Sequence, residues 1–248
     1  MVLRLTLIIL SGLLLQPALA GVYVDKSIIT FESGQALRQD VIISNPDPDP
    51  AFVEIQVLEV TSPGEQDESR TVVKDPERIG LIASPRRLMI PAGTQRAVRL
   101  VSLNGFQDTE QVYRVNVKPV AGDVKSDKMA VMVLVTYQLL VFVEPDKIKV
   151  SLESERNGST LSLHNAGNVN LMLYGGIQCA ADQEGVDRDA ASASVEELIN
   201  PESIEDNCVE VESRRLYPGN RATLTLPRSA PVTFKLTAAG ETRELVID

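Results

Sequence analysis

Two cysteines and one histidine are the residues of this chain best suited to redox or metal chemistry. Cys179 and Cys208 are the only cysteines, and His164 is the only histidine. One histidine cannot complete a zinc shell and no Cys-x-x-Cys pair occurs, so these residues predict no metal site. A reactive thiol is the other alternative, but two cysteines in an exported chain most simply pair with each other. We therefore expect a structural disulfide between Cys179 and Cys208.

Residues of other catalytic types form no recognisable constellation. The sequence contains no Gly-x-Ser-x-Gly nucleophile elbow, no zinc-protease motif and no phosphate-binding loop. Acidic residues are abundant enough for a glycosidase pair, but sequence alone does not distinguish such a pair from a solvated surface. We expect a protein that is not an enzyme and that needs no cofactor.

The first twenty residues, MVLRLTLIILSGLLLQPALA, have the pattern of a secretory signal peptide. Arg4 precedes an apolar run from Leu5 to Leu15, and the small residues of Ala18-Leu19-Ala20 predict cleavage before Gly21. The alternative is a membrane anchor, but that needs an apolar run of roughly 20 residues. The formal net charge is −10, and such a chain repels nucleic acid and anionic lipid. We expect an exported protein without a nucleic-acid partner and without membrane insertion.

Short runs of aliphatic and β-branched residues recur along the chain between turn sequences such as Asn45-Pro-Asp-Pro-Asp-Pro and Pro91-Ala-Gly. Most of them alternate between apolar and polar residues, which is typical of half-buried strands. In the first half the expected strands are residues 21–24, 28–31, 38–44, 52–57, 79–83, 87–90, 96–103 and 111–120. In the second half they are residues 147–152, 159–164, 169–178, 222–226, 232–237 and 242–247.

Many short strands at regular spacing predict all-β domains of the sandwich type. The length suits two domains of about 100 residues each, and Pro145 separates the two series of strands. We therefore expect one domain over residues 21–145 and a second over residues 146–248. Between the cysteines lies an acidic, Ala/Ser-rich insert, residues 180–207, which we interpret as a solvated loop without an assigned function.

The stretch Met129–Pro145, MAVMVLVTYQLLVFVEP, is strand-forming and apolar on both faces. Its odd-numbered residues share one face of a strand, beginning with Met129, Val131, Val133, Val135 and Tyr137. The expected hairpin partner, residues 111–120, has an apolar face and a polar face that carries Arg114, Asn116 and Lys118. An apolar row of residues 129–140 must then lie beside these polar side chains rather than in the core.

Two interpretations of this strand remain open. The first is a central strand that is buried on both sides, or a strand boundary placed at the wrong residue. The second is a strand exposed for use, which adds to a partner's sheet so that its main chain pairs and its alternate side chains fill a groove. Burying three or four of these side chains is worth on the order of 5–10 kcal/mol before the cost of association.

The order of these segments resembles the PapD-like periplasmic chaperones of the chaperone–usher pilus pathway. The matching residues include VYVDKSIITFESG (22–34), VIISNPDPDPAFVEIQV (41–57), IASPRRLMIPAGTQRAVRLV (82–101), EQVYRVNVKPV (110–120) and LSLHNAGNVNLML (161–173). The resemblance is closest to the alternate, colonisation-factor-type branch, in which YRV, Asn-x-Gly-Asn-Val and a second-domain cysteine pair recur. It covers nearly all of the chain after residue 20.

The resemblance implies a boomerang of two immunoglobulin-like β-sandwich domains that acts in the periplasm. Chaperones of this family bind incomplete pilin subunits, complete them by donor-strand complementation, and deliver them to an outer-membrane usher. The donor residues would be Met129, Val131, Val133, Val135 and Tyr137. A free strand of this kind also suits a self-capping homodimer.

A second function class is a secreted Ig-like surface adhesin or a pilus structural protein. A pilus subunit would be a single domain with its own N-terminal donor arm, whereas two domain-length patterns follow residue 20 here. An adhesin needs a ligand site, which is often aromatic, and this chain has 4% aromatic residues and no Trp. The sequence therefore favours a chaperone.

The resemblance also implies a cationic anchor for the carboxylate at the subunit's C-terminus. In the best-known members an arginine on the first strand and a lysine late in the donor strand hold this carboxylate, but the corresponding positions here are Ile28 and Leu140. A carboxylate removed from water still needs a cationic partner. The candidates are Arg114, Lys26 and Arg99, although basic residues on the outer face of a strand are usually just solvated.

Overall fold

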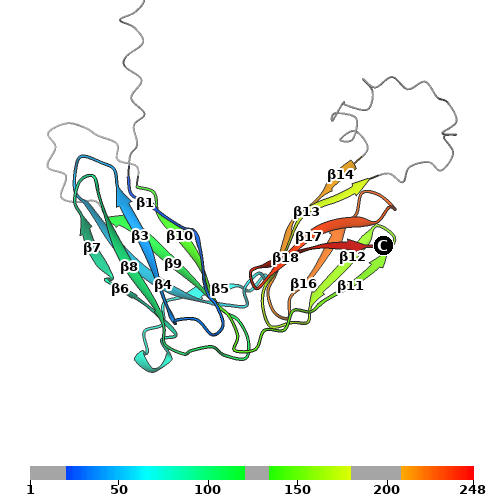
Figure 1. The fold of residues 1–248 in the computed structure, drawn as a ribbon, viewed down its shortest axis with the longest axis horizontal. Helices are drawn as coiled ribbons and strands as arrows, with labels where there is room; N and C mark the ends of the chain where they lie inside the picture. Colours follow the sequence, from blue (N-terminus) through cyan, green and yellow to red (C-terminus); the bar gives the residue numbers. More distant parts are fainter. Residues whose placement is uncertain (1–20, 121–133, 180–207) are drawn as a thin grey trace, which may run out of the picture.

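The computed structural model of this chain describes residues 21–120, 134–179 and 208–248. These ranges form strands, with one 3-10 turn at Pro76–Arg78. The strands make two β-sandwiches set at an angle to each other, which gives the molecule the outline of a boomerang (Figure 1). The expected fold class, all-β with two immunoglobulin-like sandwiches, is therefore confirmed.

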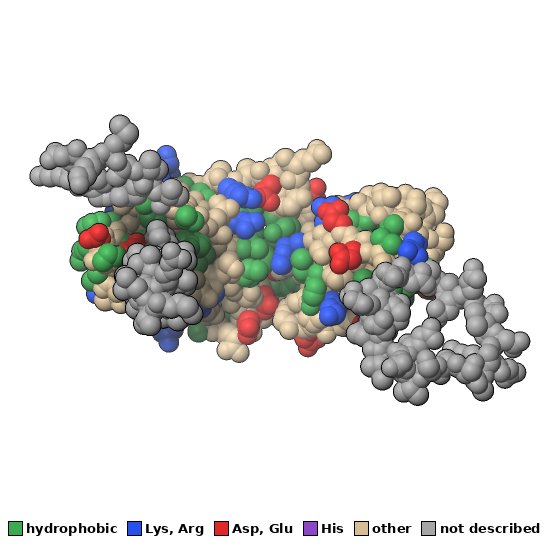
Figure 2. All heavy atoms as spheres, turned by 90° about the horizontal axis from the view of Figure 1, so that it is seen from above, with side chains coloured by type: hydrophobic (Ala, Val, Ile, Leu, Met, Phe, Trp, Pro, Cys, Tyr) green, Lys and Arg blue, Asp and Glu red, His purple; other side chains and the backbone are tan. Residues whose placement is uncertain are grey.

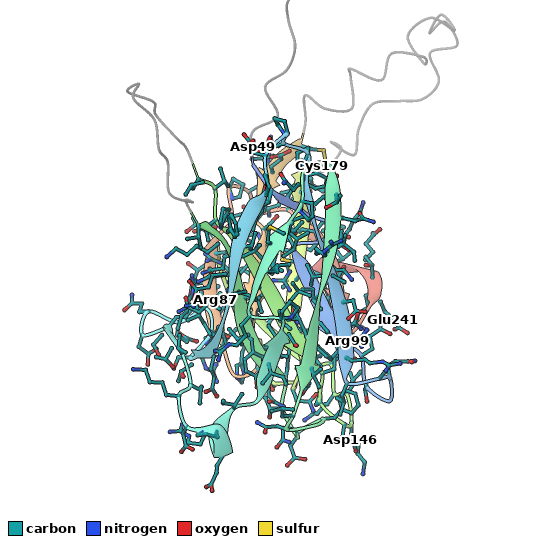
Figure 3. The ribbon with its side chains drawn as sticks, turned by 90° about the vertical axis from the view of Figure 1, so that its left-hand side faces the viewer. Asp49, Arg87, Arg99, Asp146, Cys179 and Glu241 are labelled. Atoms are coloured by element: carbon teal, nitrogen blue, oxygen red, sulfur yellow. A yellow bond between two sulfur atoms is a disulfide. The ribbon has the colours of Figure 1, made fainter. Side chains whose placement is uncertain are left out.

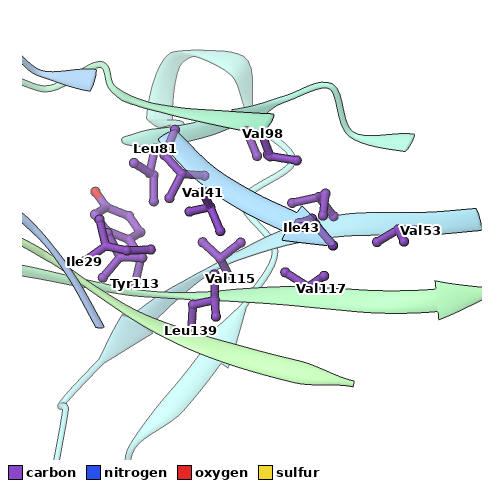
Figure 4. Close-up of a cluster of buried hydrophobic side chains, with 14 of the residues drawn as sticks. Ile29, Val41, Ile43, Val53, Leu81, Val98, Tyr113, Val115, Val117 and Leu139 are labelled. Carbon is purple, nitrogen blue, oxygen red and sulfur yellow. The ribbon is translucent and has the colours of Figure 1, made fainter. Parts of the chain in front are cut away.

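The first sandwich has two sheets, in the orders β1-β3-β8-β6 and β2-β10-β9-β4-β5, and β7 also pairs with β4. Its strands are β1 Tyr23–Val24, β2 Ile28–Phe31, β3 Arg38–Asn45, β4 Ala51–Thr61, β5 Ser69–Thr71, β6 Leu81–Ser84, β7 Arg87–Ile90, β8 Thr94–Ser102, β9 Gln111–Val120 and β10 Tyr137–Val143. Alternate side chains of both sheets point into the space between them (Figure 4). They form the core of this domain, with Ile43, Val115 and Leu139 among its buried members.

The second sandwich has the sheets β11-β12-β16 and β14-β13-β17-β18, and β15 pairs with β13. Its strands are β11 Leu152–Asn157, β12 Thr160–Asn165, β13 Leu171–Cys179, β14 Cys208–Val211, β15 Arg214–Leu216, β16 Arg221–Thr225, β17 Val232–Ala238 and β18 Glu241–Ile247. A separate core contains Leu163, Leu173 and Phe234. The expected disulfide between Cys179 and Cys208 is present and joins directly paired residues of β13 and β14 (Figure 3).

The strand expected at residues 147–152 is wrong, because the first strand of the second domain begins at Leu152. Ile148 and Val150 alternate with polar residues as they would in a strand, yet both are exposed. The main chain of Lys149 instead bonds to Asn168, so this segment connects the two domains. Three short strands, β5, β14 and β15, were not expected because they lack a clear alternating apolar pattern.

Asn45 and Asn165 occupy equivalent corners of the two sandwiches. Each is the last residue of its strand and is buried. Its side-chain oxygen accepts the N–H two residues ahead, and its Nδ2 donates to carbonyl groups of more distant residues. The partners are Asp47, Asp49, Ile90 and Pro91 for Asn45, and Gly167, Val169 and Leu216 for Asn165. One carboxamide thus ties a strand end to another strand of each domain.

We predict that Asn165→Ala lowers the free energy of unfolding by about 1–3 kcal/mol, because two buried carbonyl groups lose their donor. Urea denaturation followed by circular dichroism measures this change. Asn157→Ala, at the exposed end of β11, is the matched control and should change stability by about 0.5 kcal/mol or less. Equal effects of the two substitutions would contradict the role given to Asn165.

Candidate functional site

Strand β10 has a neighbour on both sides along only part of its length. It pairs antiparallel with β9 from Tyr137 to Val143, but parallel with β2 only from Leu140 to Val143. The N–H of Leu140 donates to the carbonyl of Ser27 at 2.9 Å. Because main-chain groups alternate in direction along a strand, those of Gln138 point to the same side. Within the described ranges no strand pairs with that side upstream of Leu140.

The odd-numbered side chains of this segment form one row. Leu139, Val141 and Val143 are buried in the core of the first sandwich, and Tyr137 packs against its rim. Val135 lies two residues before Tyr137, upstream of the first residue of β10, and is 51% exposed. Of the expected donor residues, Met129, Val131 and Val133 lie outside the described residues. The core-facing row of β10 therefore leads directly into an exposed valine.

The opposite face of β10 explains part of the apolar character of this strand. Leu140 lies beside Arg114, and Gln138 lies beside Asn116 and donates a hydrogen bond to it at 3.0 Å. Leu140 and Phe142 are nevertheless buried, because Tyr217 of the second domain packs against them with Val60 and Val112. The interpretation as a central strand thus fits residues 139–143, whereas residues 134–136 are exposed.

The space between the two sandwiches is a cleft in which apolar and basic side chains alternate. Figure 2 looks into this opening and shows hydrophobic side chains with Lys and Arg side chains among them. Arg114 lies in register between Leu140 and Leu58, and its Nε atom is buried without a hydrogen-bond partner in the described part of the chain. Arg215 of the second domain stacks on Phe142, 5.4 Å from the ring centre. Two guanidinium groups therefore border the cleft.

The other two basic candidates lie elsewhere. Arg99 on β8 donates two hydrogen bonds of 2.8 Å to Asp40 on β3, in the sheet that faces away from the second domain (Figures 1 and 3). The hydrogen bond from Arg99 keeps the pKa of the exposed Asp40 carboxyl below its usual value, and the charge of Lys26 acts on the same carboxyl. The structure therefore brings neither Arg99 nor Lys26 into the cleft with Arg114.

Asn168 fixes the junction between the domains. Its Nδ2 donates to the carbonyl groups of Asp108 and Lys147 at 2.8 Å, and its Oδ1 accepts the N–H of Lys149 at 2.7 Å. The nearby Gly167 is required because a Cβ at that position would collide with the Lys149 carbonyl. Within the Asn-x-Gly-Asn-Val sequence, Asn165 therefore bonds at the corner of the sandwich, and Gly167 allows the close approach of the Lys149 carbonyl. Asn168 holds the segment that connects the two domains.

Glu110 is a buried carboxylate at this junction. It accepts hydrogen bonds from the Asn170 side chain at 2.8 Å and from the Asn170 main chain at 3.2 Å, and Arg215 bonds to the same asparagine. Burial raises the pKa of Glu110 to about 7, against the hydrogen bonds from Asn170 and the charge of Arg215, which lower it. The junction therefore contains a carboxyl group that titrates near neutral pH. No pattern in the sequence indicated it.

Metal-binding and membrane-spanning features are absent from the residues that the structure describes. In these ranges, no group of three or more His, Cys, Asp or Glu side chains is arranged to hold a metal ion. His164 contacts the exposed Glu153 at 2.8 Å. No helix among the described residues is long and apolar enough to cross a membrane.

Comparison with known proteins identifies relatives of this chain. The family described as "Pili and flagellar-assembly chaperone, PapD N-terminal domain" matches residues 21–149. One relative, named as a fimbrial subunit of CFA/I in Escherichia coli, is 23% identical over 176 residues, which are 67% of this chain and 65% of the relative. Another, named as a fimbrial subunit of CS1 in Escherichia coli, is 28% identical over 139 residues, which are 53% of this chain and 58% of the relative. The matches thus span less than two thirds of each relative.

Solved structures share the fold along almost the whole chain. The class 5 fimbriae chaperone CfaA has a TM-score of 0.64 at 20% identity, and the match covers 92% of this chain and 98% of that chain. The Salmonella enterica SafA pilin in complex with the SafB chaperone gives a TM-score of 0.59 at 14% identity, with 94% and 98% covered. At these identities the likeness shows the fold.

We predict that Glu110 makes stability depend on pH in a defined direction. A carboxyl with a raised pKa in the folded state stabilises the protein fully below pH 4.5, the unfolded value, and this contribution is lost as the pH rises to about 7. Glu110→Gln should therefore gain roughly 2–4 kcal/mol relative to the wild type between pH 4.5 and pH 8. Urea denaturation at both pH values measures the difference. Glu155→Gln, on an exposed residue of β11, should show none, and a pH-independent difference for Glu110→Gln would contradict the assignment.

Proposed function

Because this chain belongs to the pili and flagellar-assembly chaperone family, we propose that it binds pilus subunits by donor-strand complementation through β10 and the residues before it. Pilus chaperones of this family serve chaperone–usher systems and are periplasmic. In this proposal residues 1–20 are a signal peptide that is removed on export, and the chaperone delivers its subunit to an outer-membrane usher.

The main support for this proposal is the side of β10 that has no neighbouring strand upstream of Leu140 in the described residues. The main-chain groups of Gln138 face a side of the strand without a partner in the described part of the chain, so an incoming strand can pair there. Val135 is exposed just upstream of this strand, and it would extend the core-facing row if a partner ordered residues 134–136 as a strand. A partner strand at this edge would continue both the sheet and the core of the first domain, and a fully buried valine is worth roughly 1.5–3 kcal/mol.

Relatives of the same fold support this choice of partner. One solved structure contains a chaperone with a tip adhesin of CFA/I fimbriae, and another contains a chaperone with a pilin. These complexes are observations on those proteins. Together with the free strand edge they favour, as the partner of this chain, an incomplete pilus subunit.

Arg114 is the cation that we propose for the subunit's C-terminal carboxylate. It lies on the neighbouring strand, beside Leu140, and faces the cleft. Its Nε is already buried without a partner among the described residues, so a carboxylate that enters the cleft would satisfy an existing donor. Ile28 and Leu140 lie opposite each other in the β2–β10 pair, so apolar side chains occupy two adjacent positions there.

We predict that Val135→Asp abolishes recovery of a one-to-one complex with a co-expressed pilin of the same operon, because a charge would enter the partner's apolar groove. Co-purification from the periplasm measures this, and Val133→Asp should act in the same way. Thr136→Asp, on the exposed neighbouring residue whose side chain would face the other way if the strand extended upstream, is the matched control. If Val135→Asp instead unfolds the free chaperone, the valine belongs to its own core and the proposal fails.

We predict that Arg114→Ala reduces the recovered complex at least tenfold, since a carboxylate in the cleft would lose its charged partner. Arg99→Ala is the control, because that exposed guanidinium pairs with Asp40 outside the cleft. The same co-purification, with the melting temperature of each free variant, provides the measurement. Unchanged recovery with Arg114→Ala would remove Arg114 as the anchor without affecting the role of β10.

A further inference from the structure

The β4–β5 hairpin reaches from the first sandwich across the cleft to the second domain (Figure 1). At its tip Glu65 accepts a hydrogen bond from Asn220. The backbone at Gly64 approaches the ring of Tyr217 so closely that a Cβ would lie 2.9 Å from it, and the φ of +79° also favours glycine. The hairpin is therefore fitted against the second domain.

A hydrogen bond from this hairpin links β5 to β10, with β9 and β4 between them. Arg70 on β5 is paired with Val60, which lies on the cleft side of the sheet, and its Nη1 donates to the Gln138 side chain on β10 at 2.8 Å. Since β9 and β4 lie between these two strands, the bond spans the sheet diagonally. In the pairing register the row between its two ends contains Leu140, Arg114 and Leu58. The Arg70 side chain therefore crosses the row that contains the proposed anchor.

Glu68 brings a carboxylate to the same place. Its Oε1 pairs with Arg70 at 2.6 and 2.7 Å, and its Oε2 accepts the Gly64 N–H at 2.8 Å. Burial alone would raise the pKa of Glu68, but the hydrogen bonds from Gly64 and Arg70 and the charges of Arg70 and Arg114 lower it below the usual value. Glu68 thus favours its anionic form, and its charge interacts with the guanidinium groups of Arg70 and Arg114.

We propose that Glu68 is an internal stand-in for the subunit carboxylate, and that Arg70 together with Arg114 binds the carboxylate that replaces it. This inference rests on the proposed function and adds two residues to its anchor. In the free chaperone Glu68 neutralises Arg70, and the Arg70–Gln138 bond holds the hairpin to the donor strand. When a subunit enters, one carboxylate is exchanged for another, and the pairing edge beside Gln138 becomes occupied.

In this proposal the free chaperone avoids strong repulsion between its cleft arginines, because the Glu68 carboxylate offsets part of their positive charge. Glu68 pairs directly with Arg70, and its negative charge also interacts favourably with that of Arg114, so it offsets part of the positive charge at this place in the free state. The same arrangement makes binding selective, because a ligand must present a carboxylate to displace Glu68. A subunit end without a correctly placed carboxylate would leave the hairpin in its present position.

The test is a competition for a limiting amount of the same pilin that is used in the co-purification. Tagged wild-type chaperone and an untagged variant are mixed with it, and the partition ratio is measured. Glu68→Gln should take at least threefold more pilin than the wild type, because the stand-in charge is gone. Arg70→Ala should take at least threefold less. The control Glu54→Gln removes a carboxylate from the Arg87 pair on the same sheet and should give a ratio of one.

A lengthened pilin separates carboxylate exchange from a merely structural effect. With Gly-Ser added at its C-terminus the carboxylate is displaced from the cleft, so the advantage of Glu68→Gln should disappear. Glu68→Ala replaces Glu68→Gln if the latter has a lowered melting temperature. An unchanged or reduced share for the Glu68 variants, or an increased share for Arg70→Ala, would overturn this inference. Arg114→Ala is run in parallel, and its failure to reduce capture would instead count against the anchor in the proposed function.

Discussion

The position at which β2 begins to pair with β10 is the constraint on which the proposed site depends. Upstream of that point the chain belongs to the other sheet, where β1 pairs with β3. Asp25 fixes the crossing, since its N–H donates to the Ile42 carbonyl at 3.1 Å and its Oδ1 accepts the Ile42 N–H at 2.9 Å. Because the first strand changes sheets here, one side of β10 has no neighbour before Leu140 in the described residues. An edge of this kind is normally blunted or covered.

The second domain stabilises the other half of the same strand. Tyr217 packs on Leu140 and Phe142, and the clamp at Asn168 and the Glu110–Asn170 contacts set where Tyr217 lies. The two domains therefore divide β10 between them. Its C-terminal half is buried within the molecule, and in the described residues its N-terminal half has a strand neighbour on one side only. The cleft keeps a defined width because the junction is hydrogen-bonded to both domains rather than joined by a loose linker.

The sequence predicted the local elements more completely than the contacts between distant ones. β2, β7 and β9 begin and end at the expected residues, because their alternating side chains report directly which face is buried. The pattern of Ile148 and Val150 was misleading, since their segment bonds to Asn168 and not to a neighbouring strand. The packing of Tyr217 on Leu140 could not be predicted, because the two residues are 77 positions apart in sequence and their contact depends on the angle between the domains.

The candidate site was likewise predictable only in part. Arg114 followed from the polar row of β9, and its place beside Leu140 follows from the hairpin register. Glu68 and Arg70 could not be found in this way, because β5 is short, exposed and without periodicity. Their importance arises from a hydrogen bond between side chains 68 residues apart in sequence. Contacts of that range depend on the complete fold and leave no local signal.

The apolar positions 28 and 140 and the basic residue at 114 have a common physical explanation. Leu140 is 8% exposed and lies in the cluster with Phe142 and Tyr217, so a lysine there would place an ammonium group against apolar side chains, at considerable desolvation cost. A cation one strand away, at Arg114, keeps its charge at the cleft while Leu140 holds the two domains together. Its buried Nε needs an acceptor, and a carboxylate is the acceptor that also balances its charge. Domain packing and the proposed capture of a pilin can therefore use adjacent side chains of one sheet without competing for the same position.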